Sequence, residues 1–370
     1  MSGFEEAVSA APVTLPRPAL KRMIALVRAL FALSRNGQYR EYLSPLLPEV
    51  ARFDPGHEAV MMGFDFHVTG DIPSLIEVNT NAGGGLLAYR AHHPGERTGP
   101  LALPPRLEEL LRQSFLREME AFSAGRQQMP RRLAIVDEQP AEQFLYPEME
   151  VFRQLFSRWG IPALVVDPQE LQAGADGVFY GGEPVDFIYN RHCDFYLESE
   201  PLAGIRAAYL ARKVCLSPNP HVYGLLANKR RLALWTDRDL MASFGLSTAV
   251  LDLLAETVPE SRLMATLDRE NLWQERKEWV FKPVDRFGSR GVLLGRKISR
   301  SRFEQLEPEQ TLVQRLVEPS LTASGDAMLK TDFRLYVYRD RVLGVTARLY
   351  QGQVTNMRTP GGGFAPVHIR

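Results

Sequence analysis

Two groups of polar residues that suit the same ligand stand near opposite ends of this chain. Near the N-terminus, Asp65 precedes Glu77-Val78-Asn79, and near the C-terminus Lys282 precedes a glycine-containing loop, Arg286 to Gly291. Carboxylate and amide oxygens are ligands for Mg²⁺, and a lysine with a flexible glycine loop can hold phosphates. The pattern predicts one nucleotide site, which requires both ends of the chain to fold together.

The composition permits an enzyme and argues against several other classes. The chain has 370 residues and 45% hydrophobic content, enough for two or three packed units. Lys+Arg and Asp+Glu both number 44, so net charge gives no reason to expect a nucleic acid or an anionic membrane as partner. Two cysteines make no disulfide framework, and no run of about 18 apolar residues occurs. We expect a cytoplasmic protein that takes small-molecule or peptide substrates.

The N-terminal part contains a helical and a strand-like pattern. Apolar residues recur at helical spacing from Ala19 to Leu33, which predicts an amphipathic helix packed on a sheet. Met61 to Val68 and Ser74 to Asn79 flank a turn and predict a β-hairpin. Strand pairing in this hairpin would bring Asp65 and Glu77 together.

The middle of the chain alternates between strands and helices, which predicts a small α/β domain. Its last strand, Val185 to Arg191, would deliver Arg191 near a crevice at the carboxyl end of the sheet. The other predicted elements are helices at 105–124 and 148–159 and extended segments at 133–136, 162–166, 167–171 and 177–180.

The C-terminal part predicts an antiparallel α+β unit that could clamp a nucleotide. A helix is predicted from Leu232 to Phe244, and strands are predicted at 279–282, 311–314, 333–338 and 342–350. We therefore divide the chain into segments 1–100, 101–218 and 219–370.

The motifs of this last segment resemble the ATP-grasp superfamily in their running order. They are Phe281-Lys282-Pro283, the loop Arg286 to Gly291, Val313-Gln314, Asp332-Phe333-Arg334, Arg348, and Asn356 ahead of Gly361-Gly362-Gly363. In glutathione-synthetase-like and glutamate-ligase members, a helix, an Asp strand and a Glu-x-Asn strand follow the glycine element. Here the matching pieces, Leu20 to Phe31, Asp65 and Glu77-Val78-Asn79, stand at the front of the chain.

The resemblance implies an α/β and α+β protein with an ATP-grasp fold in circularly permuted order. Segment 1–100 would be the permuted C-terminal part with the metal-binding hairpin, and segment 219–370 the lid and nucleotide-binding core. Residues 130–218 resemble the Rossmann-like domain that precedes the ATP-grasp unit, including the version in glutathionylspermidine-synthetase-like proteins.

The resemblance also implies a role for each matching residue. ATP would be bound by Lys229, Lys282, Gly288, Ser289, Arg290, Gly291, Gln314, Glu318 and Asp332; Mg²⁺, as two ions, by Asp65, Glu77 and Asn79; substrate by Arg191, Asn81, Gly83 and Gly362; and the catalytic residues would be Arg334, Arg348 and Asn356. The residues themselves leave alternatives open. Lys229 also suits a solvated helix start, Arg334 and Arg348 suit surface ion pairs, and Arg191 suits a buried structural pair.

This set of groups predicts an ATP- and Mg²⁺-dependent carboxylate-amine (or thiol) ligase. A substrate carboxylate would attack the γ-phosphorus to give an acyl phosphate, and an amine or thiol would then displace phosphate, with no covalent enzyme nucleophile. The same clamp could serve a phosphotransferase or a non-catalytic nucleotide-binding regulator. The substrates stay open because they depend on loop shape, and a homodimer is compatible with the sequence.

Overall fold

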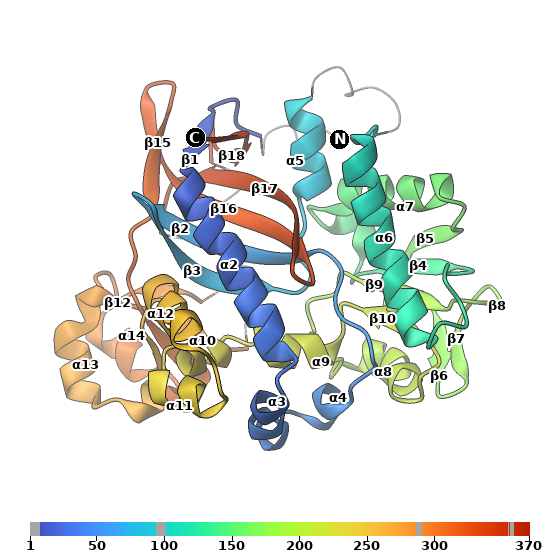
Figure 1. Ribbon diagram of the computed structural model, residues 1–370, viewed down its shortest axis with the longest axis horizontal. Coiled ribbons are helices and arrows are strands. Elements are labelled where there is room, and N and C mark those ends of the chain that lie inside the picture. The colour runs from blue at the N-terminus through green and yellow to red at the C-terminus, as the bar shows by residue number, and fades with distance from the viewer. Residues whose placement is uncertain (1–7, 94–100, 286–290, 354, 356–358) are drawn as a thin grey trace.

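The computed structural model describes residues 8–93, 101–285, 291–353, 355 and 359–370. Its centre is a six-stranded sheet of strands from both ends of the chain (Figure 1). The strand order is β18 (Gly363–Ala365), β17 (Arg341–Tyr350), β16 (Ala327–Tyr338), β2 (Met62–Thr69) and β3 (Ile72–Asn79), with β15 (Ser320–Ser324) also paired to β16. All these pairings are antiparallel.

The predicted hairpin forms, and its register brings the two acidic residues together. Asp65 lies opposite Glu77 on β3 and opposite Arg334 on β16. A bulge after Asp65 shifts the β2–β3 register, so that Phe66 pairs with Leu75. The bulge lets Leu75 and Val78, three residues apart, both face the core, whereas a regular strand would repeat every two residues.

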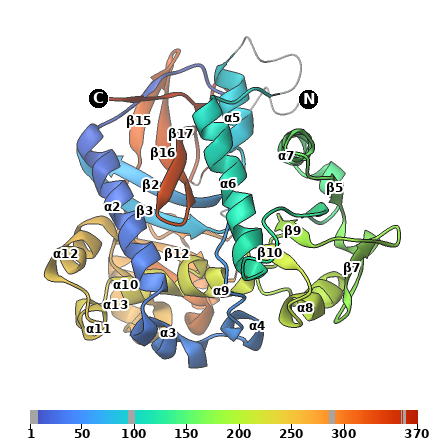
Figure 2. The same ribbon diagram turned by 45° about the vertical axis from the view of Figure 1, so that its right-hand side comes forward.

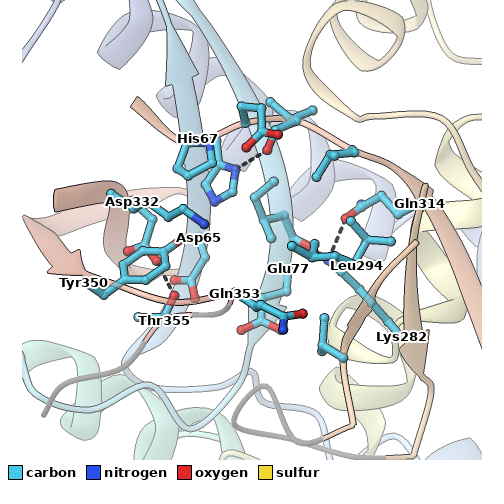
Figure 3. A pocket seen from close by; sticks show the side chains of 18 of the residues that line it. Asp65, His67, Glu77, Lys282, Leu294, Gln314, Asp332, Tyr350, Gln353 and Thr355 are labelled. Atoms are coloured by element: carbon cyan, nitrogen blue, oxygen red, sulfur yellow. Dashed lines mark hydrogen bonds between the residues drawn. The ribbon is translucent and has the colours of Figure 1, made fainter. Parts of the chain in front are cut away.

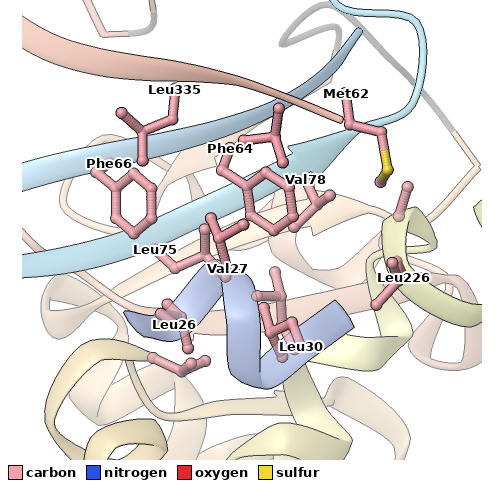
Figure 4. Packing of buried hydrophobic residues seen from close by; sticks show 14 of the residues in the cluster. Leu26, Val27, Leu30, Met62, Phe64, Phe66, Leu75, Val78, Leu226 and Leu335 are labelled. Carbon is pink, nitrogen blue, oxygen red and sulfur yellow. The ribbon is translucent and has the colours of Figure 1, made fainter. Parts of the chain in front are cut away.

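One face of this sheet is covered by helix α2 (Arg17–Ser34), which confirms the predicted N-terminal helix. Pro18 lies in its first turn, where a missing amide proton costs no helical hydrogen bond. Leu26, Val27 and Leu30 point from α2 onto the aromatic and aliphatic side chains of the hairpin (Figure 4). This cluster combines residues 13–78 with residues 222–365, so the first and last segments share one hydrophobic core.

The middle segment forms a parallel sheet with helices on both faces (Figure 2). Its strand order is β10 (Cys215–Ser217), β9 (Phe187–Asn190), β4 (Leu133–Val136) and β5 (Ala163–Val166). Helices α6 (Pro105–Phe122) and α7 (Tyr146–Arg158) cover one face, and α8 (Ala203–Leu210) covers the other. The segment 167–171 adds no strand to this sheet, because Asp167 caps a 3₁₀ turn at Pro168–Glu170. A separate small sheet follows, made of β6 (Gln172–Gly174), β7 (Gly177–Tyr180) and β8 (Glu183–Pro184).

A third antiparallel sheet carries the lysine strand. Its order is β11 (Ser261–Leu263), β14 (Thr311–Arg315), β12 (Trp279–Pro283) and β13 (Leu293–Leu294). The prediction of one helix from Leu232 to Phe244 is wrong: α10 (Arg230–Trp235) and α11 (Arg238–Ser243) form instead. The helical pattern is interrupted at Asp237, because its carboxylate accepts a hydrogen bond from the amide of Leu240 and caps the second helix.

The remaining helices and strands lie outside these four sheets. They are the parallel pair β1 (Val13–Leu15) and β19 (Val367–Ile369), a π-helical turn at Tyr223–Ala227, and the helices α3 (Gly37–Leu43), α4 (Glu49–Arg52), α5 (Gly85–His92), α9 (Pro220–Val222), α12 (Thr248–Thr257), α13 (Arg269–Glu275) and α14 (Arg300–Glu304). Within the described residues, no helix combines the length and apolar character needed to cross a membrane.

The core that joins the two ends of the chain can be tested at Leu30, which is fully buried on α2. We expect Leu30→Ala to lower the free energy of unfolding by about 2–5 kcal/mol, because it removes apolar contacts and leaves a cavity. The matched control is Leu46→Ala at a position 59% exposed, which should change stability by less than about 0.5 kcal/mol. Urea unfolding measures both, and equal effects would contradict the assigned packing.

Candidate functional site

Two adjoining cavities lie on the face of the central sheet opposite α2. The first lies between this sheet and the lysine sheet, and Asp65, Lys282 and Asp332 are among its lining residues (Figure 3). The second, of about 370 Å³, reaches the carboxyl ends of the parallel strands. Both cavities are lined by Glu77, Arg348 and Thr355. A ligand in one cavity would therefore lie beside a ligand in the other.

Strand alternation explains why this face is polar. On β2, Phe64 and Phe66 belong to the core, whereas Asp65 between them lines the first cavity. On β16, Phe333 and Leu335 belong to the core, whereas Arg334 between them lines the second cavity. Successive side chains of a strand point to opposite faces, so a buried apolar layer on one side produces a charged layer on the other.

The charged layer contains a network of buried ion pairs. The carboxylate of Asp65 accepts hydrogen bonds from Nε and Nη2 of Arg334, both at 2.6 Å, and from Nη2 of Arg348 at 2.8 Å. Nε of Arg348 also donates to Asp332 at 2.6 Å. The surface-ion-pair alternative for the two arginines is excluded, because the side chains of both are nine-tenths or nearly nine-tenths buried.

The arginines control the ionisation of Asp65. Burial acts to raise the pKa of the Asp65 carboxyl, but the guanidinium groups of Arg334 and Arg348 outweigh burial and hold that pKa well below its ordinary value. Asp65 therefore stays ionised at neutral pH, and its charge compensates the buried arginines.

Lys282 forms a buried cation on the floor of the first cavity. Its Nζ donates to Oε1 of Gln314 at 2.6 Å and to the carbonyl oxygen of Ile76 at 3.0 Å, and the residue is 5% exposed. Burial lowers the pKa of Lys282 to about 8, while Glu77 acts to raise it. Gln314 also donates to the hydroxyl of Ser261 at 3.3 Å, so its side chain positions the lysine.

The predicted metal ligands lie together but differ in their availability. Nδ2 of Asn79 donates weakly to Asp65 at 3.3 Å and to Glu77 at 3.4 Å. Both carboxylate oxygens of Asp65 already accept arginine N–H groups. Within the described part of the chain, no three His, Cys, Asp or Glu side chains gather closely enough to hold a metal. Glu77 and Asn79 do fit Mg²⁺, which takes few protein oxygens and fills its other positions with phosphate and water.

Glu318, Asp332 and Lys229, also predicted to bind the nucleotide, differ in their partners and burial. Glu318 lines the first cavity and pairs with Arg296 at 2.6 Å. Asp332 lines it too, but its oxygens accept from Arg348 and from the hydroxyl of Thr355, both at 2.6 Å. Burial lowers the pKa of Lys229, which lies near enough to Glu77 for that carboxylate to oppose the shift.

The predicted glycine loop is described only in part. Gly291 has φ of 75°, a left-handed conformation that favours glycine. The predicted residues Gly288, Ser289, Arg290 and Asn356 lie outside the described residues.

Three of the four predicted substrate residues line the second cavity: Asn81, Gly83 and Arg191. Nη1 of Arg191 donates to the carbonyl oxygen of Ala82 at 2.8 Å, and Nδ2 of Asn81 donates to the carbonyl oxygen of Arg191 at 3.0 Å. A Cβ at Gly83 would collide with the guanidinium of Arg191, so the glycine gives the arginine its place.

The fourth predicted substrate residue, Gly362, is not among the described residues that line these two cavities. A Cβ at this position would meet the carbonyl oxygen of Leu349, so the glycine lets its loop pack on β17. Phe364, two residues later, lines the second cavity instead.

Three residues of the site were missed by the sequence analysis. His67 lines the first cavity, and its place two residues after Asp65 on the same strand could have identified it. Asp137 directly follows strand β4 and lines the second cavity, and burial raises its pKa to about 6 although Arg191 acts to lower it. Glu148 accepts from the amides of Gly84 at 2.7 Å and Leu86 at 2.9 Å and so holds the loop after β3. No local sequence signal points to Glu148.

The network predicts a large, pH-dependent effect of Asp65→Asn. Loss of the carboxylate leaves two buried guanidinium groups undercompensated, so we expect the free energy of unfolding to fall by about 3–5 kcal/mol at pH 7. The folded-state pKa of Asp65 is depressed, so the contribution of the carboxylate is present above its ordinary pKa of 3.8 and is lost as the pH falls further. The difference between wild type and variant should therefore shrink below about pH 4.

The matched control is Asp252→Asn, which removes an exposed ion pair with Arg238. This change should cost less than about 1 kcal/mol. Urea unfolding from pH 7 to pH 3 measures both variants, and a loss at Asp65 as small as at Asp252 would contradict the network's role.

Comparison with known proteins supports the architecture. No protein-family model matches the chain, and no curated protein sequence matches it. The chain is similar to the crystal structure of a protein from Methylobacillus flagellatus KT that is provisionally named a gamma-glutamylcysteine synthetase. The TM-score is 0.53 with 13% sequence identity, over 92% of this chain and 85% of that chain. This likeness shows that the two chains share a mixed α/β fold.

Proposed function

We propose that this protein is an ATP- and Mg²⁺-dependent carboxylate-amine (or thiol) ligase that forms an amide bond through an acyl phosphate. The observation that carries the proposal is the meeting of two cavities at Glu77 and Arg348. One cavity contains the buried cation of Lys282, and the other offers arginines and polar groups for a substrate. A ligase of this kind needs such an arrangement, because the substrate carboxylate must reach the terminal phosphate.

The first cavity suits a nucleotide. Lys282 would neutralise phosphate charge from its strand, and Lys229 would add a second cation beside Glu77. Leu316 and Val317 line the cavity, and their backbone groups would contact the adenine. Glu318 would accept hydrogen bonds from the ribose hydroxyls once its ion pair with Arg296 is broken. The predicted loop residues Gly288, Ser289 and Arg290 would add donors for the phosphates.

Glu77 and Asn79 would hold Mg²⁺ between the nucleotide and the substrate, and the ion would offset the charge of the phosphates. Asp65 would join them as a ligand only by releasing an oxygen from Arg334 or Arg348. Arg348 lines both cavities, so its guanidinium would neutralise the phosphoryl group during transfer. Arg334 lines the second cavity and would stabilise the oxyanion that forms when an amine attacks the acyl phosphate.

We further propose that the fold is an ATP-grasp fold in circularly permuted order. Support comes from the pairing of β2 with β16, which puts the N-terminal acidic hairpin beside the C-terminal Asp332-Phe333-Arg334 strand. Support for the reaction class comes from the name of the structurally similar protein, since a gamma-glutamylcysteine synthetase joins a carboxylate to an amine.

One observation favours a second candidate, a non-catalytic nucleotide-binding regulator. Asp65 is fully engaged by Arg334 and Arg348, so this part of the proposed metal site is satisfied by protein groups alone. A regulator would bind Mg·ATP without releasing ADP.

The two candidates differ in turnover. We expect pools of amino acids and small peptides with amines or thiols to stimulate ADP release from Mg·ATP, with a condensed product seen by mass spectrometry. Glu77→Gln should lower both by at least about 100-fold, because it removes a charge that acts on the transferred phosphoryl group through the metal. Glu183→Gln, at an exposed position on β8, is the matched control. ATP binding without turnover in any pool would favour the regulator.

Nucleotide binding should also move a proton at Lys282. With its pKa lowered to about 8, the free lysine is mostly neutral at pH 9. Nearby phosphates favour the charged form, so Mg·ATP binding at pH 9 should be accompanied by proton uptake. Calorimetry in two buffers of different ionisation enthalpy measures this uptake. It should disappear in Lys282→Met, and equal binding enthalpies for wild type in both buffers would argue against phosphate contact with Lys282.

A further inference from the structure

Two residues of opposite charge stand side by side at one end of the second cavity. Asp137 follows β4 and Arg191 follows β9, and these strands are parallel neighbours whose last paired residues are Val136 and Asn190. The amide of Arg191 donates to the carbonyl oxygen of Val136 at 2.8 Å, which continues the pairing. The carboxyl ends of parallel strands are where such sheets bind ligands. Both side chains line the cavity.

Among the described residues, no hydrogen bond joins these two side chains, although each charge acts on the pKa of the other group. The guanidinium of Arg191 donates through Nη1 to the carbonyl oxygen of Ala82 at 2.8 Å and to the hydroxyl of Tyr189 at 3.4 Å. These acceptors are neutral, and its Nε and Nη2 have no hydrogen-bond acceptor among the described residues. Arg191 is 6% exposed. The carboxylates of Glu148 and Asp137 act on this guanidinium electrostatically, but neither accepts one of its hydrogen bonds among the described residues. A ligand carboxylate could therefore accept from the remaining donors.

Asp137 has matching capacity for a cation. One carboxylate oxygen accepts from the amide of Glu138 at 2.9 Å, and the other has no hydrogen-bond donor within the described structure. Burial raises the pKa of Asp137 only to about 6, so the carboxyl is mostly ionised at neutral pH. Among the described residues, the cavity end therefore presents one carboxylate oxygen of Asp137 without a hydrogen-bond donor, next to Nε and Nη2 of Arg191, which have no hydrogen-bond acceptor.

We propose that Asp137 and Arg191 together bind the ammonium and carboxylate groups of a free α-amino acid. A planar guanidinium offers paired donors to a carboxylate, and a carboxylate oxygen accepts from an ammonium. Because the two residues follow adjacent strands, they match charges carried on one carbon atom. Asn81 and Gly83 complete this end of the cavity, and the glycine leaves room for the guanidinium.

This inference rests on the proposed ligase function for its consequence. Asp137 and Arg191 line only the second cavity, whereas Glu77 and Arg348 line both. An α-carboxylate held by Arg191 is therefore directed away from the terminal phosphate. Where this amino acid is the substrate that is activated, the carboxylate that becomes the acyl phosphate must lie on its side chain, which makes it an acidic amino acid.

Binding without nucleotide tests the inference independently of turnover. The probes are L-glutamate and L-aspartate, each also as its N-acetyl and its α-carboxamide derivative, titrated into the full chain by calorimetry. We expect wild type to bind at least one of the two free amino acids. Either derivatisation should weaken binding by about 10- to 100-fold, because each removes a charge-assisted hydrogen bond.

The variants assign each head-group contact to its residue. Asp137→Asn should weaken binding of the free amino acid. It should also remove most of the preference for the free amino acid over its N-acetyl derivative, while the preference over the α-carboxamide stays. Arg191→Gln should show the reverse pattern. Glu138→Gln, an exposed neighbour, is the matched control and should bind as wild type does. Asp137 is only half-buried, so its variant keeps the test available if Arg191→Gln does not fold.

The outcomes separate this inference from the ligase proposal. Failure of wild type to bind either amino acid, or an unchanged preference over the N-acetyl derivative in Asp137→Asn, would overturn the head-group assignment. If ADP release that depends on Glu77 occurs alongside either result, the ligase proposal stands without it. If the expected binding pattern appears but no amine or thiol yields ADP and product, the head-group assignment stands and the ligase proposal fails.

Discussion

The buried attraction between Asp65 and the two arginines is the interaction on which the site depends. Asp65 belongs to the N-terminal hairpin, and its partners Arg334 and Arg348 lie 269 and 283 residues further along the chain. None of these charges could be buried alone without a cost of several kcal/mol. Their mutual compensation lets a charged layer exist beneath the cavities, while the apolar layer of the same strands packs against α2. Stability and site geometry are thus linked through one sheet.

This charged layer also determines what the cavities can do. The two arginines already compensate the charge of Asp65, and the charged side chains that line both cavities are Glu77 and Arg348. Lys282 adds an ammonium group that donates a hydrogen bond to Gln314, and burial lowers its pKa to about 8. In the proposed function, a phosphate bound here would favour the charged form of Lys282 that burial disfavours. At the far end, Asp137 and Arg191 act on each other electrostatically but share no hydrogen bond among the described residues, unlike Asp65 and its two arginines.

Much of the fold was predictable from local patterns. The period of two in β2, β16 and β17 and the helical spacing of α2 led to the correct elements, because backbone geometry alone sets which side chains share a face. The helix from Leu232 to Phe244 failed for a local reason as well: Asp237 offers the backbone a cap that competes with helix continuation. The resemblance of motif order identified Asp65, Glu77, Lys282, Arg334 and Arg348 as one group, and the structure brings all five to the two cavities.

The sequence by itself determined most of the elements, the polar and apolar faces of the strands, and the residue types available for the candidate site. Only the tertiary structure decided the partners. It paired Asp65 with two arginines, bonded Gln314 to Lys282, and placed Asp137 and Arg191 side by side after adjacent strands. The physical reason is the difference in sequence separation between the interactions that form secondary structure and those that pair charges. Secondary structure follows from preferences within a few residues, whereas charge pairing depends on the register and packing of strands that lie hundreds of residues apart in the chain.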